Sequence, residues 1–172
     1  YWLGSCYASG TVVNKNIETA AYWYEKSSEQ GYAEAQLELA YCYSYGDGVE
    51  KNDRKAVELL QKSAEQGNAR AKYLLAYYYF NGDGGLGRSA TQAAALWKEA
   101  AEQGNNSAAC QLAWCYENGY GYSQNYAKAA EWYRKAAENG ISDAQSRLGD
   151  FYYYGYGVDN NYAEAAKWYR KA

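Results

Sequence analysis

Residues 39–67 read LAYCYSYGDGVEKNDRKAVELLQKSAEQG, and the pattern of this stretch returns at a fixed interval along the chain. Its closing triplet, Glu-Gln-Gly or Glu-Asn-Gly, ends at Gly31, Gly67, Gly104 and Gly140, in steps of 36, 37 and 36 residues. A second marker, Tyr-x-x-Gly, has its glycines at Gly10, Gly46, Gly82, Gly119 and Gly155. Because two independent markers share one period and one single-residue insertion, the chain is built from internal repeats. This period is typical of stacked helix pairs.

The first half of each repeat has the spacing of an α-helix. Ala35, Leu39 and Tyr43 are four positions apart, which places them on one helix face. Small residues beside the leucine allow a neighbouring helix to approach closely. We expect the helix to end at a glycine pair such as Gly46 and Gly48, because glycine adopts positive φ at little cost.

The second half of each repeat begins with a helix-capping residue. Asparagine or serine occupies this position in every repeat: Asn16, Asn52, Ser89, Asn125 and Asn161. An alanine follows four positions later in every repeat, and a pair of apolar residues follows the alanine. Such side chains accept a hydrogen bond from the first turn of a helix. Since one pair of helices is too small to bury its own apolar face, the pairs must stack.

Composition narrows the function classes. The 172 residues are 48% hydrophobic and 22% charged, which is typical of a folded protein, and the net charge is −3 with a pI near 5.1. We therefore expect no nucleic-acid partner, since binding to a nucleic acid depends on concentrated positive charge on the protein. No apolar run reaches the length that inserts into a membrane.

The chain has no histidine, which removes most zinc sites and imidazole bases. We predict no metal, no cofactor and no catalytic residues, and hence that the chain is not an enzyme.

Two motifs that look chemical have structural explanations. Residues 82–87 match the dinucleotide pattern G-x-G-x-x-G, but they follow a predicted helix where that pattern requires a strand. Cys6, Cys42 and Cys115 share one repeat column with Tyr78 and Phe151, which indicates an apolar packing position. We expect free thiols, which favour a reducing compartment without assigning one. The chain has no methionine and looks like a segment of a longer protein, so a targeting signal beyond it stays open.

The repeated string resembles the Sel-1-like repeat family, a relative of the tetratricopeptide solenoids. Residues 39–67 carry the likeness, and the same string recurs in residues 144–172. The resemblance implies an all-α fold, a right-handed α-α superhelix (solenoid) of stacked helix pairs. We expect a single domain over residues 1–172, with five pairs at 1–31, 32–67, 68–104, 105–140 and 141–172. Neither end has a polar capping repeat, so self-association through the ends is a further expectation.

If the first helix of each pair lines a concave face, as in tetratricopeptide proteins, the packing columns define which residues point into the groove. The columns predicted to be exposed there are Glu34, Leu37, Tyr41, Ser44, Tyr45, Arg70, Tyr73, Tyr77, Phe80, Asn81, Ser107, Cys110, Trp114, Glu117, Asn118, Asp143, Ser146, Asp150, Tyr153 and Tyr154. Most of the central positions are aromatic. The candidate partner-binding residues are Tyr41, Tyr45, Arg70, Tyr73, Tyr77, Phe80 and Trp114.

Two explanations of this aromatic stripe stay open. The rings either pack onto neighbouring helices or line a groove, where Tyr and Trp are effective anchors for a peptide. On the second explanation the chain is a protein–protein interaction scaffold or adaptor, and its partner is a protein or peptide. The alternative function is a carbohydrate- or cell-wall-binding module, because the same rings stack on sugars.

Overall fold

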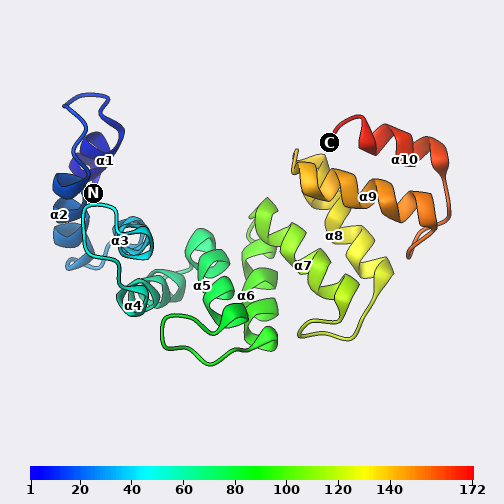
Figure 1. Ribbon diagram of the computed structural model, residues 1–172, viewed down its shortest axis with the longest axis horizontal. Helices are drawn as coiled ribbons and strands as arrows, with labels where there is room; N and C mark the ends of the chain where they lie inside the picture. The colour runs from blue at the N-terminus through cyan, green and yellow to red at the C-terminus, as the bar shows by residue number, and fades with distance from the viewer. The chain divides into compact units, whose positions relative to one another are not determined.

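The computed structural model describes residues 1–172 and contains ten α-helices and no β-strand (Figure 1). The predicted all-α fold of successive helix pairs is therefore confirmed. The chain forms two compact units, unit 1 (residues 1–88) and unit 2 (residues 89–172). No helix combines the length and the apolar character needed to cross a membrane.

Unit 1 is a run of five helices in which consecutive helices pack against each other. The helices are α1 (Trp2–Ser9), α2 (Ile17–Ser28), α3 (Ala33–Tyr45), α4 (Asp53–Glu65) and α5 (Ala69–Asn81). Unit 2 repeats this arrangement with α6 (Ala90–Glu102), α7 (Asn106–Asn118), α8 (Tyr126–Glu138), α9 (Ser142–Tyr154) and α10 (Tyr162–Tyr169).

The predicted capping column begins all five even-numbered helices. The Asn52 side-chain oxygen accepts a hydrogen bond of 3.0 Å from the backbone N–H of Lys55, and Ser89 caps α6 through Gln92 in the same way. Asn16, Asn125 and Asn161 cap their helices identically. Each bond satisfies a backbone donor that the first turn leaves without a helical partner.

Glycine is required where the loop of one pair touches the pair before it. Gly48 has φ +71°, and a Cβ atom there would lie 2.5 Å from the carbonyl oxygen of Ile17. The repeat glycine Gly46 ends α3 in the left-handed conformation, as the pattern predicted. The glycine pairs therefore end the helices and also bring successive pairs into contact.

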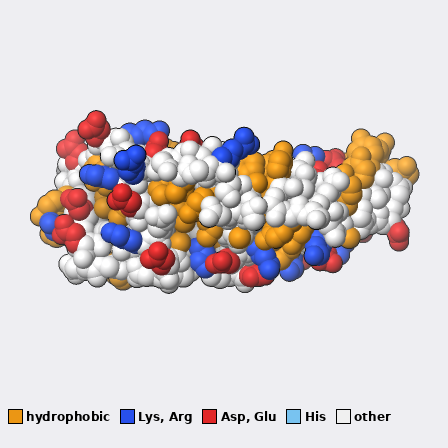
Figure 2. All heavy atoms as spheres, turned by 90° about the horizontal axis from the view of Figure 1, so that it is seen from below, with side chains coloured by type: hydrophobic (Ala, Val, Ile, Leu, Met, Phe, Trp, Pro, Cys, Tyr) orange, Lys and Arg blue, Asp and Glu red, His pale blue; other side chains and the backbone are white.

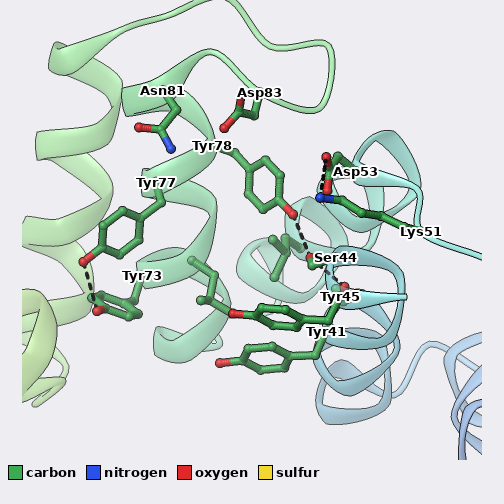
Figure 3. A pocket seen from close by; sticks show the side chains of 13 residues that line it. Tyr41, Ser44, Tyr45, Lys51, Asp53, Tyr73, Tyr77, Tyr78, Asn81 and Asp83 are labelled. Carbon is green, nitrogen blue, oxygen red and sulfur yellow. Dashed lines mark hydrogen bonds and ion pairs between the residues drawn. The ribbon is translucent and has the colours of Figure 1, made fainter. Parts of the chain in front are cut away.

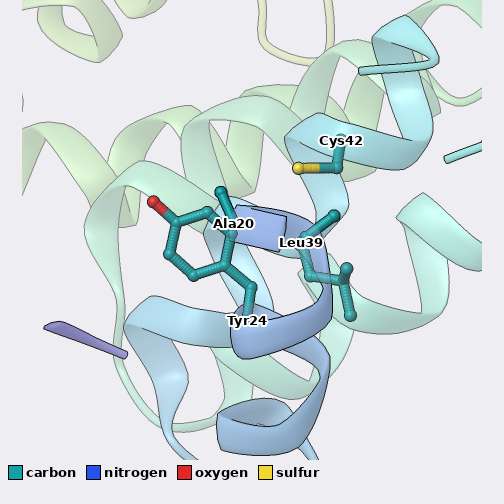
Figure 4. Close-up of a cluster of buried hydrophobic side chains, with 5 residues drawn as sticks. Ala20, Tyr24, Leu39 and Cys42 are labelled. Atoms are coloured by element: carbon teal, nitrogen blue, oxygen red, sulfur yellow. The ribbon is translucent and has the colours of Figure 1, made fainter. Parts of the chain in front are cut away.

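The core of unit 1 is built from the repeat columns. Tyr24 of α2 packs with Ala20 on its own helix and with Leu39 and Cys42 of α3, all of them buried (Figure 4). In unit 2 the corresponding α8 residue is Tyr133, whose ring meets Phe151 of α9 edge-on at 5.4 Å. The cysteine column is thus a packing position, and all four cysteines are free thiols.

Candidate functional site

The structure places six of the seven candidate partner-binding residues in unit 1 and one in unit 2. Tyr41 and Tyr45 lie on α3, and Trp114 lies on α7. The remaining four, Arg70, Tyr73, Tyr77 and Phe80, lie on α5. Four of these residues border one cavity, and the others lie beside it or apart from it.

This tyrosine cavity lies between α3 and α5 and has a volume of about 600 Å³. Ala40, Leu60 and Leu74 supply apolar surface to it. The other residues that border it are Tyr41, Ser44, Tyr45, Lys51, Asp53, Tyr73, Tyr77, Tyr78, Asn81 and Asp83. A volume of this order accommodates a few side chains of a bound peptide.

The four candidate tyrosines form two pairs of rings (Figure 3). Tyr41 and Tyr45 are stacked, with centroids 6.2 Å apart and an interplanar angle of 11°. Tyr73 and Tyr77 meet edge-on at 5.2 Å, and their hydroxyl oxygens are 3.1 Å apart. Tyr45 is 70% exposed, whereas Tyr41, Tyr73 and Tyr77 are half-buried. Each of these rings therefore packs on another ring of its own helix and also borders the cavity.

The phenol groups around the cavity are neutral hydrogen-bonding groups. Ser44 donates to the backbone carbonyl of Ala40 at 2.9 Å, and its hydroxyl lies 2.7 Å from that of Tyr78. Burial raises the pKa of Tyr78 above its usual value. Burial also raises the pKa of Tyr41, although the nearby Arg70 opposes this shift. These phenols consequently stay protonated and present both a donor and an acceptor at neutral pH.

Charged residues surround the rings in mixed sign. Lys51 lies 3.6 Å from Asp53, and Arg70 lies 3.5 Å from Glu38. The Arg70 guanidinium is also 5.9 Å from the centroid of the Tyr41 ring. These pairs are partly exposed and contribute little stability. They form a polar rim around the aromatic surface. The arrangement is suited to recognition of side chains.

The pattern of the Sel1 repeat family matches the whole chain, at residues 1–32, 33–68, 69–105, 106–141 and 142–172. The chain belongs to the Sel1 repeat family. The single-domain assignment over residues 1–172, with pairs beginning at 32, 68, 105 and 141, stays a prediction.

Two solved structures with Sel1-type folds share about a third of the sequence. A protective antigen of uropathogenic Escherichia coli strains is 34% identical over 99% of this chain, with a TM-score of 0.93. This chain spans 36% of that antigen. A Sel1 repeat protein from Oxalobacter formigenes is 34% identical over 99% of this chain and 70% of its own, with a TM-score of 0.90. No curated protein matches the chain.

An immunity protein from Pseudomonas aeruginosa shows the same fold at lower identity. It is 24% identical over 99% of this chain and 62% of its own, with a TM-score of 0.62. This likeness supports the repeat fold alone.

Two of the positions predicted to be exposed in the groove are buried. Leu37 is 1% exposed and Cys110 is 8% exposed, so the prediction was wrong for both. Tyr73 occupies the same repeat column as these two residues and is only half-buried. Ser146 stands in the same column and is also only partly buried, so burial in this column does not follow side-chain length.

An exposed group of tyrosines surrounds the α9–α10 loop of unit 2. The repeat columns predicted Tyr153 and Tyr154 to be exposed but did not single out the other three rings. Tyr156 stacks on Tyr126 at 5.3 Å and on Tyr154 at 5.4 Å, and Tyr153 meets Tyr162 at 5.2 Å. All five rings are exposed. Figure 2 shows hydrophobic side chains gathered at the end where Figure 1 draws α9 and α10. The sequence feature that could have indicated this group is Tyr156, a tyrosine at the loop position that Asp47 and Asp83 occupy in unit 1.

Proposed function

We propose that this chain is a protein-interaction module and that the tyrosine cavity between α3 and α5 binds a peptide segment of a partner protein. Members of the Sel1 repeat family are protein-interaction scaffolds. The observation that carries the proposal is the convergence of Tyr41, Tyr45, Tyr73 and Tyr77 on one cavity of about 600 Å³. In this proposal the chain has no catalytic role.

Tyrosine suits this task for physical reasons. Its ring buries a large apolar area, its side chain has few rotatable bonds to immobilise, and its hydroxyl still bonds to water or to a partner's backbone. Residues of this kind are enriched among those that dominate binding free energy in protein interfaces. The half-buried Tyr73 and Tyr77 are also held against each other, so less conformational entropy is lost when a partner binds.

The test uses peptides selected by the protein from a random library. Binding of the selected peptides is then measured by fluorescence polarisation for wild type and for the double variant Tyr41→Ala, Tyr45→Ala. We expect affinity to fall by at least about tenfold, since the loss of an aromatic anchor costs more than ~1 kcal/mol. The matched control is Tyr22→Ala, which removes an exposed ring on α2 that does not border the cavity.

Two outcomes contradict the proposal. Equal affinity of the double variant and wild type places the peptide elsewhere, and unfolding of the double variant by circular dichroism identifies the rings as core. A peptidoglycan or glycan pull-down tests the carbohydrate alternative. A sugar signal that disappears in Tyr45→Ala, or in Trp114→Ala, together with an absence of selected peptides, favours a carbohydrate-binding module.

A further inference from the structure

Unit 2 contains a second cavity that the proposed peptide site does not use. It has a volume of about 400 Å³ and lies between α7 and α9. Trp114 and Cys110 border it from α7, Asp143 and Asp150 border it from α9, and Tyr133 of α8 contributes to its floor. In the repeat pattern this is the position that the tyrosine cavity has between α3 and α5, but the chemistry of the lining is different.

The lining of this cavity contains more negative than positive charge. Asp143 and Asp150 border it, and Glu117, whose side chain is only 15% exposed, contacts the lining residues Tyr133 and Arg147. The single cation is Arg147, whose guanidinium nitrogen is 3.8 Å from Glu117 and 3.7 Å from Asp150. These separations are longer than hydrogen bonds. Arg147 therefore balances one of three carboxylates and leaves the acceptor capacity of the oxygens largely unused.

The hydrogen bonds within the fold also leave acceptors available. Glu117 accepts a bond of 2.6 Å from the Tyr133 hydroxyl, and Asp150 accepts one of 2.8 Å from Tyr169. Each carboxylate has further lone pairs. Asp143 makes no hydrogen bond and no ion pair within the protein, although it borders the cavity.

The buried thiol beside these groups experiences the same negative charge. Cys110 is 8% exposed, forms no hydrogen bond and borders the cavity. Burial and then the charge of Asp143 raise the pKa of this thiol to about 11. The thiol is therefore neutral at physiological pH, and its sulfur is a weak acceptor for an N–H donor.

We propose that this cavity binds an arginine side chain presented by the partner. A guanidinium group donates in a planar fork to carboxylates such as Asp143 and Asp150. Its flat face is attracted to an indole ring such as that of Trp114, which packs against Tyr120 at 4.7 Å and also borders the cavity. A lysine ammonium has one compact charge and no flat face, so it fits the same lining less well. The proposal rests on the proposed function in one respect, namely that the arginine belongs to a protein partner.

The test follows the indole resonances of the full chain by ¹⁵N-edited NMR, with the Trp114 signal assigned from a Trp114→Phe variant. The probe is N-acetyl-arginine amide, which carries the guanidinium and no carboxylate. We expect a saturable shift of the Trp114 signal with an affinity in the millimolar range, weakened by added salt. N-acetyl-citrulline amide, which is nearly isosteric and neutral, should produce no saturable shift, and N-acetyl-lysine amide should bind several-fold more weakly.

The variants locate the site. Asp143→Asn should lower the affinity for the arginine probe by about threefold or more. The double variant Asp143→Asn, Asp150→Asn should lower it by about tenfold. Asp143 makes no bond within the fold, so its single variant stays informative even if loss of the Tyr169 bond in the double variant disturbs α10. Asp159→Asn, an exposed change in the α9–α10 loop, is the matched control and should leave binding unchanged.

An equal shift with citrulline, a shift that persists in both variants, or no shift at all overturns the proposal. This test is independent of the peptide site, because the probe contains no peptide segment and the signal comes from unit 2. Equal peptide affinity of wild type and of Tyr41→Ala, Tyr45→Ala would contradict the peptide site in unit 1 but not the probe titration in unit 2, so the two proposals can fail separately.

Discussion

The hydroxyl of Tyr133 lies 2.6 Å from a carboxylate oxygen of Glu117, and this hydrogen bond joins α8 to α7 inside unit 2. Tyr133 is 1% exposed and the Glu117 side chain is 15% exposed, so water replaces the bond only in part when it is lost. Burial, strengthened by the bond to Glu117, raises the pKa of Tyr133 far above that of an ordinary phenol. The group is therefore a permanent donor to a carboxylate in the interior of the repeat.

Replacement of this donor should destabilise the protein. We expect Tyr133→Phe to lower the free energy of unfolding by about 1.5–3 kcal/mol, the range for a buried hydrogen bond to a charged group. The measurement is urea unfolding followed by circular dichroism. The matched control is Tyr169→Phe, which removes a bond of 2.8 Å to Asp150 from a residue that is 42% exposed. Water can solvate Asp150 there, so the control should lose much less stability, and equal losses would contradict the role of burial.

Alkaline pH should lower the free energy of unfolding. Burial raises the pKa of the Cys42 thiol to about 11 and that of Cys115 to about 12, from an ordinary value of 9.0. The buried Tyr133 phenol is raised in the same direction. These acids are neutral in the folded state and ionise at their ordinary values once unfolded, so the unfolded state releases protons first. Stability should be complete below about pH 9 and should fall steadily as the pH rises through 10 and 11.

This prediction is checked by urea midpoints measured from pH 8 to pH 11. Cys115→Ala removes one of the titrating groups, so the variant should lose less stability between pH 8 and pH 11 than wild type does. The comparison is made on that difference, because the substitution also creates a small cavity that lowers stability at every pH. A midpoint that stays constant from pH 8 to pH 11 would show that these groups do not control stability.

The capping asparagines should each contribute measurably. Asn52→Ala removes the acceptor for the backbone N–H of Lys55 and should lower the free energy of unfolding by about 1 kcal/mol. The measurement is the thermal midpoint by circular dichroism. Asn14→Ala is the matched control, since Asn14 is exposed and makes no hydrogen bond, and its midpoint should match wild type. If Asn52→Ala also matches wild type, the cap adds nothing to stability.

The repeated columns predicted the helices and their caps because those features depend on local spacing. Ala35, Leu39 and Tyr43 lie on one helix face in any packed arrangement, and Asn52 caps α4 through a residue only three positions away. The burial of Leu37 could not be predicted in this way. It depends on how closely neighbouring helices approach at that point, and the column that Leu37 shares with Tyr73 does not encode that distance.

The candidate site was predicted only in part for a related reason. The columns placed Tyr41, Tyr45, Tyr73 and Tyr77 toward one face, and the structure shows that they border one cavity. Their pairing into a stacked and an edge-on arrangement depends on rotamers, which the spacing does not fix. The exposed ring cluster around Tyr156 also depends on loop geometry, and the helical period carries no information about loops.

Alanine should destabilise the protein more at Gly48 than at Gly31. Gly48 and Gly31 both have positive φ, at +71° and +84°, so alanine at either position adopts an unfavourable backbone conformation that costs about 1–2 kcal/mol. A Cβ at Gly48 would also lie 2.5 Å from the Ile17 carbonyl oxygen, whereas nothing lies within 4 Å of a Cβ at Gly31. Backbone atoms cannot rotate away as a side chain does, so the first and second helix pairs of unit 1 must separate. We therefore expect Gly48→Ala to cost about 1–3 kcal/mol more than Gly31→Ala in urea unfolding, by the magnitude typical of overpacking. Equal losses in the two variants would mean that backbone conformation alone requires glycine at Gly48, and that the contact between the loop and α2 is loose enough to admit a methyl group.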